Sequence, residues 1–197
     1  MFWIILSVLL WGLLHSLLAS SRSKEIAQRV FGAGVKRFYR LAYNVFACIS
    51  FLPVLVVLFI VPDRTLYIVI FPWAALMLGG EALAVAALVV GLLLSRPLDF
   101  AGLRQLGTPD DRPAQLITDG LYRYVRHPLY TAGLVFIWLL PVMTANVLAV
   151  NIALTVYVII GAFLEEHRLQ SEFGQVYRDY MASTPMFIPF PKRNKTR

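Results

Sequence analysis

The polar residues with the clearest chemical potential are an arginine, a histidine and a proline in direct succession, Arg126-His127-Pro128. Proline fits the first turn of a helix, where its missing N–H costs nothing, so we expect a helix to begin at Pro128. Its first turn would present unpaired N–H groups and a partial positive charge, which suit a carboxylate or a phosphate. Arg126 and His127 flank this predicted anion site. Gly133 lies on the same helix face as Tyr130 and leaves room for a ligand or another backbone.

These residue types also have a simpler interpretation, because tyrosine and arginine side chains commonly line the headgroup level of a membrane. For Tyr122 and Arg123 the interpretations as an anchor and as part of a site stay open. Arg126, His127 and Gly133 together favour a site.

A second polar group consists of Glu165 and Glu166, which follow a long apolar stretch. Near the end of a helix these acids would oppose the helix dipole, unless the helix continues or a cation lies nearby. Apolar and aromatic residues recur at helical spacing and predict continuation: Leu169, Phe173, Val176, Tyr177 and Tyr180. One interpretation pairs Glu165 with Arg168 at a spacing of three. In the other, a carboxylate faces a bound cation such as an amine or a sulfonium.

Two further ionisable residues, His15 and Glu81, fall within apolar stretches. An ionisable group at membrane depth is a candidate for function, although a hydrogen bond between helices is an equal alternative. The sequence has three histidines, His15, His127 and His167, and they are too scattered to predict a metal site. They leave a haem-binding membrane protein of the carotene isomerase-like type as one alternative function, and a non-catalytic membrane scaffold as another.

The elements that must position these residues are membrane helices. Of 197 residues, 59% are hydrophobic and 15% are charged, a composition that excludes a soluble domain of this size. A helical crossing needs about 20 apolar residues. The sequence predicts an all-α integral membrane protein, a single domain over 1–197 with five transmembrane helices and then a cytoplasmic helix. The helices are expected at about 1–19, 41–61, 66–94, 128–141, 146–164 and 165–182.

The basic residues predict the orientation of these helices. Of 18 lysines and arginines, 17 fall in the segments 20–40, 95–127 and 165–197, which lie on one side of a five-helix topology. The positive-inside rule places these segments in the cytoplasm and the N-terminus outside. We therefore expect a multi-pass protein of a bacterial or archaeal inner membrane, and the net charge of +7 is not a nucleic-acid footprint. Positive charge follows the first apolar run rather than preceding it, so we expect a retained helix rather than a signal peptide.

Two motifs in the C-terminal half resemble the isoprenylcysteine carboxyl methyltransferase family. That family includes small prokaryotic membrane methyltransferases and is related to phospholipid N-methyltransferases. The motifs are Gly120-x-Tyr122-x-x-x-Arg126-His127-Pro128-x-Tyr130-x-x-Gly133 and Glu165-Glu166-x-x-Leu169-x-x-x-Phe173-Gly174-x-x-Tyr177-x-x-Tyr180, with a closing Pro185. Three earlier stretches are more similar to the bacterial methanethiol S-methyltransferase branch: His15-Ser16, Tyr39–Asn44 and Leu98–Gln105.

The resemblance implies an enzyme that uses S-adenosylmethionine, bound in a cytoplasmic site between the loop before Pro128 and the C-terminal helix. It implies that the following residues contact the cofactor: Arg126, His127, Pro128, Tyr130, Gly133, Glu165 and Glu166. The acceptor would be small or lipophilic, with a thiol as first choice and a prenylcysteine-type carboxylate as second. A thiol must become a thiolate, and His127, His15 or Tyr122 could assist. A carboxylate needs no base.

Overall fold

The computed structural model describes residues 1–32, 34–95, 101–103 and 115–189. They group into two compact units. Unit 1 holds the described residues of 1–69, 101–103 and 141–157, and unit 2 holds those of 70–95, 115–140 and 158–189. The predicted motif residues 98–100, 104 and 105 lie outside the described part. The expectation of a single domain over 1–197 stays a prediction.

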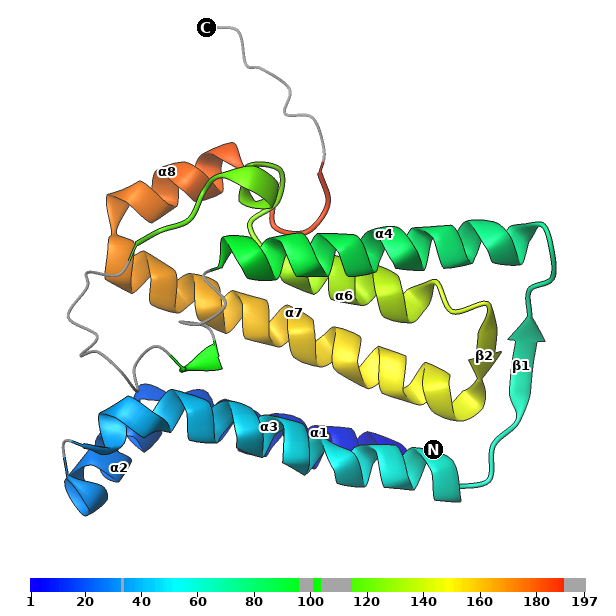
Figure 1. Ribbon diagram of the computed structural model, residues 1–197, viewed down its shortest axis with the longest axis horizontal. Coiled ribbons are helices and arrows are strands. Elements are labelled where there is room, and N and C mark those ends of the chain that lie inside the picture. The colour runs from blue at the N-terminus through cyan, green and yellow to red at the C-terminus, as the bar shows by residue number, and fades with distance from the viewer. Residues whose placement is uncertain (33, 96–100, 104–114, 190–197) are drawn as a thin grey trace, which may run out of the picture. The chain divides into compact units, whose positions relative to one another are not determined.

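Unit 1 is built on two long apolar helices, α1 (Phe2–Ala19) and α3 (Val35–Ile60), which lie side by side (Figure 1). The first turns of α7 (Ala145–Phe173) complete it. Its core contains small and branched residues: Ile4, Val8, Val54, Ala149, Val150 and Ala153. Most large apolar side chains of α1 and α3 are exposed instead, as expected where lipid is the solvent. The predicted helices at 1–19 and 41–61 are confirmed, and α3 begins six residues earlier.

The segment between α1 and α3 forms a helix that the sequence analysis did not predict, α2 (Ser21–Phe31). It begins at a capping serine, Ser20, whose hydroxyl accepts a hydrogen bond from the Ser23 N–H at 3.2 Å. Its apolar residues Ile26 and Val30 are exposed, and arginines and a lysine occupy the other faces. An amphipathic helix of this kind suits a membrane surface.

The prediction of a helix over 66–94 is wrong in its first part. Residues Thr65–Ile68 form the strand β1, which pairs antiparallel with β2 (Val142–Thr144), and helix α4 begins only at Trp73. Two features explain the difference: the segment is rich in β-branched and aromatic residues, which favour a strand, and Pro72 disfavours helical backbone at the residue before it. The fold is therefore mostly rather than wholly helical.

The carboxylate of Asp63, just before β1, ties this end of the strand pair to the start of α7. Its Oδ1 accepts hydrogen bonds from the N–H groups of Arg64 at 2.8 Å and Asn146 at 3.0 Å. Desolvation opposes ionisation, but the bonds from Thr144, Asn146, Arg64 and Ala145 prevail and lower the pKa of Asp63. The side chain acts as an N-cap contributed from outside the helix.

Unit 2 is built on α4 (Trp73–Leu94) and α6 (Pro128–Trp138), which pack along each other (Figure 1). Two glycines of α4 allow this approach. A Cβ at Gly80 would lie 2.5 Å from a Leu139 side-chain carbon, and one at Gly91 would lie 2.8 Å from Leu129. Small residues at such contacts are typical of packed membrane helices.

Helix α6 begins at Pro128 as predicted but ends at Trp138, after eleven residues. Its length of about 16 Å is short of the ~30 Å of a bilayer core. Among the described residues, four helices are long and apolar enough to cross a membrane, namely Phe2–Ala19, Arg37–Ile60, Trp73–Leu94 and Ala145–Phe173. The prediction of five crossings and their orientation is not confirmed.

The predicted continuation of the last long helix past Glu165 is confirmed, because α7 runs unbroken from Ala145 to Phe173. Gly174 then turns the chain with a φ of 56°, a conformation that glycine adopts without strain. The chain continues as α8 (Gln175–Ser183). The expected helix over 165–182 is thus the end of α7 followed by α8.

Candidate functional site

The start of α6 is held in place by the chain that follows α8, which we call the tail segment (Thr184–Ile188). The N–H of Arg126 donates to the Pro185 carbonyl at 2.9 Å, and the N–H of His127 donates to the Met186 carbonyl at 3.1 Å. These two main-chain donors, which flank the predicted anion site, are therefore occupied by the protein itself.

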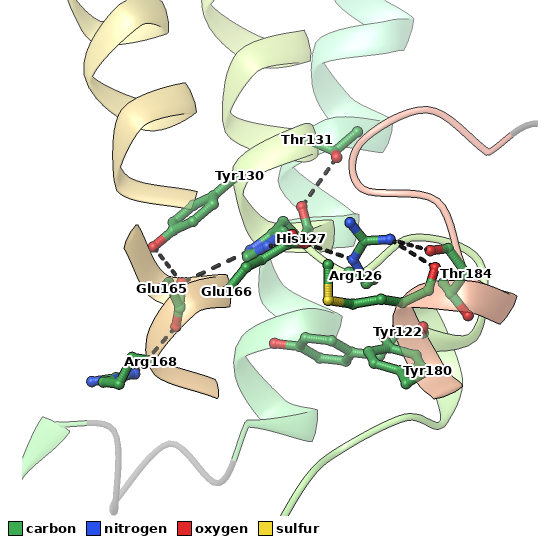
Figure 2. A network of polar contacts seen from close by, with 11 residues as sticks. Tyr122, Arg126, His127, Tyr130, Thr131, Glu165, Glu166, Arg168, Tyr180 and Thr184 are labelled. Carbon is green, nitrogen blue, oxygen red and sulfur yellow. Dashed lines mark hydrogen bonds and ion pairs between the residues drawn. The ribbon is translucent and has the colours of Figure 1, made fainter. Parts of the chain in front are cut away.

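The Arg126 side chain extends this connection to α7. Its Nε donates to Glu166 Oε1 at 2.6 Å, and its Nη1 donates to the carbonyls of Met181 and Thr184 (Figure 2). Both members of the ion pair are buried, with 10% of the Arg126 side chain and 6% of the Glu166 side chain exposed. One guanidinium thus joins the start of α6, the end of α7, and the end of α8 with the tail segment.

The His127 imidazole lies between two carboxylates. Its Nε2 is 3.3 Å from Glu166 Oε1, and its Nδ1 is 3.8 Å from Glu165 Oε2. The ring stacks on Tyr130, with centroids 5.3 Å apart and planes within 4° of each other. The Tyr130 hydroxyl donates to the same Glu165 oxygen at 2.9 Å. Figure 2 shows this compact arrangement of ring pair and carboxylates.

Burial lowers the pKa of His127, and although Glu165 and Glu166 raise it, the desolvation prevails, helped by the Arg126 charge. The imidazole is therefore neutral near pH 7 and carries one N–H. The shorter distance assigns that proton to Nε2, which donates to Glu166. The unprotonated Nδ1 then faces an oxygen of Glu165. This edge of the site has more acceptors than donors and suits a positive charge.

Both sequence interpretations of Glu165 find support in the geometry. Its Oε1 lies 3.6 Å from Arg168 Nη2, the predicted pair at a spacing of three, but 58% of that arginine side chain is exposed. A pair this open to solvent contributes little. The second oxygen of Glu165 points toward His127 and Tyr130 instead, which is the geometry that the second interpretation requires.

Beside this network lie tyrosines from the short 3₁₀ helix η2 (Gly120–Arg123) and from α8. The Tyr180 hydroxyl donates to the Tyr122 carbonyl at 2.6 Å, and the Tyr122 hydroxyl lies 2.9 Å from that of Ser95. Tyr177 is 1% exposed, and burial raises the pKa of its phenol to about 12. Tyr177 therefore stays protonated near neutral pH and is unsuited to act as a base.

Most of the predicted site residues meet in unit 2. Arg126, His127, Tyr130, Glu165 and Glu166 form the network described above, and Pro128 occupies the first position of α6. Gly133 and Tyr122 also belong to unit 2. Gly133 is on α6, where an added Cβ would meet no described atom within 4 Å; Tyr122 is in η2. His15 belongs to unit 1, and Glu81, on α4, buries one carboxyl oxygen without a hydrogen-bond partner among the described residues.

The sequence analysis missed the tail segment as a structural partner of the site. Thr131 Oγ1 donates to the Phe187 carbonyl at 2.9 Å, and the Phe187 ring lies 5.8 Å from that of His127. Pro185 was part of the motif, which was the available signal. The main-chain carbonyls that bind Arg126 could not be identified from residue types. Among the described residues, no group of three or more His, Cys, Asp or Glu could hold a metal ion.

Comparison with known proteins gives a consistent result for the half of the chain that carries these motifs. Residues 98–176 match the sequence profile of a family described as phospholipid methyltransferase. The chain is 34% identical over 113 residues to a methanethiol S-methyltransferase of Crocosphaera subtropica. The aligned region covers 55% of this chain and 44% of that protein. The chain is 46% identical over 77 residues to a methanethiol S-methyltransferase of a Pseudomonas species, covering 39% and 29%.

A more distant relative acts on a different acceptor according to its name. Protein-S-isoprenylcysteine O-methyltransferase B of Arabidopsis thaliana is 33% identical over 79 residues, covering 39% of this chain and 40% of that protein. The chain thus spans less than half the length of these relatives. No solved structure matches it significantly. The matches confirm the predicted resemblance to the isoprenylcysteine carboxyl methyltransferase family and its methanethiol S-methyltransferase branch.

Proposed function

On the premise that this chain shares the core of a membrane methyltransferase family, we propose that it transfers a methyl group from S-adenosylmethionine to a small or lipophilic acceptor. A thiol is the first choice of acceptor, because several of the relatives are methanethiol S-methyltransferases by name. A prenylcysteine-type carboxylate is the second, following the plant relative. The bilayer is the other partner, since four helices in the described part of the chain are long and apolar enough to cross it.

The observation that carries the proposal is the surplus of acidic oxygens around the stacked rings of His127 and Tyr130. The reactive centre of S-adenosylmethionine is a sulfonium, which supplies an electrophilic methyl group. The Glu165 carboxylate beside an aromatic face suits such a cation by Coulomb attraction and by a cation–π contact. The donor set of the site therefore fits this cofactor.

The other predicted cofactor residues have distinct roles in this proposal. Pro128 starts α6, and the partial positive charge at this end of the helix would suit the carboxylate of the cofactor. Gly133, one turn further, leaves the face of α6 open. Arg126 has its donors directed to protein acceptors, so we assign it a positioning role: it holds Glu166 and the tail segment against the site.

Methyl transfer is an in-line displacement, so orientation of the reactants would supply much of the acceleration. A thiol acceptor must first lose its proton. Of the three candidate bases, His127 has an unprotonated Nδ1 that faces Glu165. The Tyr122 hydroxyl is occupied by its contact with Ser95. The third candidate, His15, is considered in the next subsection.

The proposed topology has five crossings, with the N-terminus outside and the basic segments on the cytoplasmic side of a bacterial or archaeal inner membrane. The charge distribution supports it, as does the length of α7, which at about 43 Å exceeds the bilayer core and lets Glu165 and Glu166 project beyond it. Helix α6 would cross with the residues that flank it. A water-soluble cofactor would then bind where a lipid-dissolved acceptor can reach it.

The direct test is methyl transfer by the purified protein in detergent or nanodiscs, with radiolabelled S-adenosylmethionine and a panel of alkanethiols, prenylcysteines and amines. The proposal predicts labelled thioether from the alkanethiols. No labelled product from any acceptor, together with no cofactor-induced rise in Tm, would contradict it. An absorption spectrum of the same sample tests the haem alternative, which requires a Soret band.

A further inference from the structure

The histidine of α1 has one nitrogen that the described residues leave unused. His15 Nε2 lies 2.6 Å from the Tyr43 hydroxyl on α3, within unit 1. Its Nδ1 is buried and has no hydrogen-bond partner in the described part of the chain. A polar atom buried among apolar helices without a partner is destabilising. An unused nitrogen at this depth therefore calls for a functional explanation.

Aromatic rings surround this imidazole. The ring centroids of Trp11, Tyr43 and Tyr157 lie 5.1, 5.0 and 6.1 Å from that of His15. The Tyr157 hydroxyl lies 3.3 Å from that of Ser16. Aromatic rings make favourable contacts with sulfur, and a half-buried imidazole among them is suited to a small ligand that is apolar apart from one hydrogen-bonding atom.

The sequence stretches that resemble the S-methyltransferase branch meet at this cluster. Tyr43 lies in the second of them and contacts His15 in the first. Asn44, the next residue, donates from Nδ2 to the carbonyl of Ala101 in the third, at 3.1 Å. Gly102 follows with a φ of 82°, so close to α3 that a Cβ would lie 2.6 Å from a backbone nitrogen. Three stretches far apart in the sequence thus form one arrangement in unit 1.

We propose that His15 binds the thiol acceptor through Nδ1 and accepts its proton, and that Tyr43 is a positioning residue that orients the imidazole. This inference rests on the proposed function for the identity of the ligand as a thiol.

The chemistry requires one proton transfer. With the neutral imidazole protonated on Nε2, that N–H donates to the Tyr43 oxygen and Nδ1 presents a lone pair. The S–H bond of the thiol breaks, an N–H bond forms at Nδ1, and the electron pair stays on sulfur. The resulting imidazolium and thiolate form an ion pair, an arrangement that stabilises thiolates beside histidines. Tyr43 accepts the Nε2–H bond throughout and fixes the ring.

A purely structural role explains the arrangement less well. A histidine that only joins α1 to α3 needs the bond to Tyr43 and gains nothing from a second buried nitrogen. Glutamine at this position would supply one polar group to Tyr43, whereas the base needs the imidazole. The two roles therefore differ in their response to His15→Gln.

The test measures thiol binding without the cofactor. Trifluoroethanethiol serves as the probe, and fluorine NMR of the purified full-length protein in nanodiscs reports its affinity. We expect saturable binding to the wild type, weakened about tenfold by His15→Gln, since one hydrogen bond to a potentially charged group is lost. Tyr43→Phe should weaken it less. The matched control is His167→Gln, which removes an exposed histidine and should leave the affinity unchanged.

Nitrogen NMR of the imidazoles separates positioning from folding. In Tyr43→Phe the resonances of His15 should shift toward a mixture of tautomers, while the thermal unfolding of the variant stays close to that of the wild type. The inference is overturned if the wild type does not bind the probe, if His15→Gln binds it as the wild type does, or if His15 proves to ligate a haem. Because no S-adenosylmethionine is present, a failure of the proposed methyl transfer would appear in the separate labelling assay and not here.

Discussion

The buried pair of Arg126 and Glu166 allows a quantitative prediction. Arg126→Met keeps the apolar length of the side chain and removes the charge. It leaves the Glu166 carboxylate, of which 6% is exposed, without a cation, and it leaves the carbonyls of Met181 and Thr184 without their donor. The change therefore affects the junction of α6, α7 and the tail segment together.

The expected size of the effect follows from burial. Removing one partner of a buried ion pair costs about 3–5 kcal/mol, because the other charge stays desolvated. Glu166→Gln should cost less, roughly 1–3 kcal/mol, since an amide can still accept from Arg126. In the double variant neither charge is present, so its loss of stability should fall short of the sum of the single losses by at least ~1 kcal/mol.

The free energy of unfolding can be measured in mixed micelles by titration with sodium dodecyl sulfate. A double-mutant cycle with the four proteins gives the coupling energy, and Glu172→Gln, on the exposed face of the same helix, controls for loss of one negative charge. Additive effects would refute the structural reasoning. Equal stability of Arg126→Met and the wild type would refute the positioning role of Arg126. It would favour the earlier prediction that Arg126 contacts the cofactor directly.

Three further outcomes are expected. Gly102→Ala should abolish stable folding of unit 1, seen as a fall in Tm, because the added Cβ meets the α3 backbone at a φ of 82°. Asp63→Asn should lower Tm at pH 7, and the difference should shrink as the pH falls from 3.8 through the folded-state pKa of Asp63, which hydrogen bonds hold below that ordinary value. In a Cys48→Ala background, a spin label at Val30→Cys should be more accessible to oxygen than to a water-soluble nickel relaxant, and a label at Glu25→Cys should show the reverse, if α2 lies on the membrane surface.

The sequence was sufficient to predict the parts of the fold that depend on long apolar periodicity and on residue chemistry. The helix start at Pro128 and the continuation of α7 past Glu165 were both predicted from local signals, and both are confirmed. We expected the two motifs to meet from the family resemblance. The ion pair between Arg126 of the first motif and Glu166 of the second joins them in the structure.

The features that were missed depend on long-range pairing. Residues 66–68 belong to an apolar stretch, and their strand conformation follows from pairing with residues more than seventy positions later. The tail segment binds through main-chain carbonyls, which every residue type possesses. The contact between His15 and Tyr43 joins residues on different helices with no charge pattern to indicate it. Such contacts become visible only once the chain is folded.

A calorimetric titration of S-adenosylmethionine into the wild type, Glu165→Gln and Glu172→Gln in detergent micelles tests whether Glu165 contributes to cofactor binding. We place the positive charge of the cofactor beside Glu165, so Glu165→Gln should weaken binding about tenfold, the value of one charge-assisted interaction. Glu172→Gln should bind as the wild type does. Absence of saturable heat in the wild type, or equal affinities in all three proteins, would contradict the account.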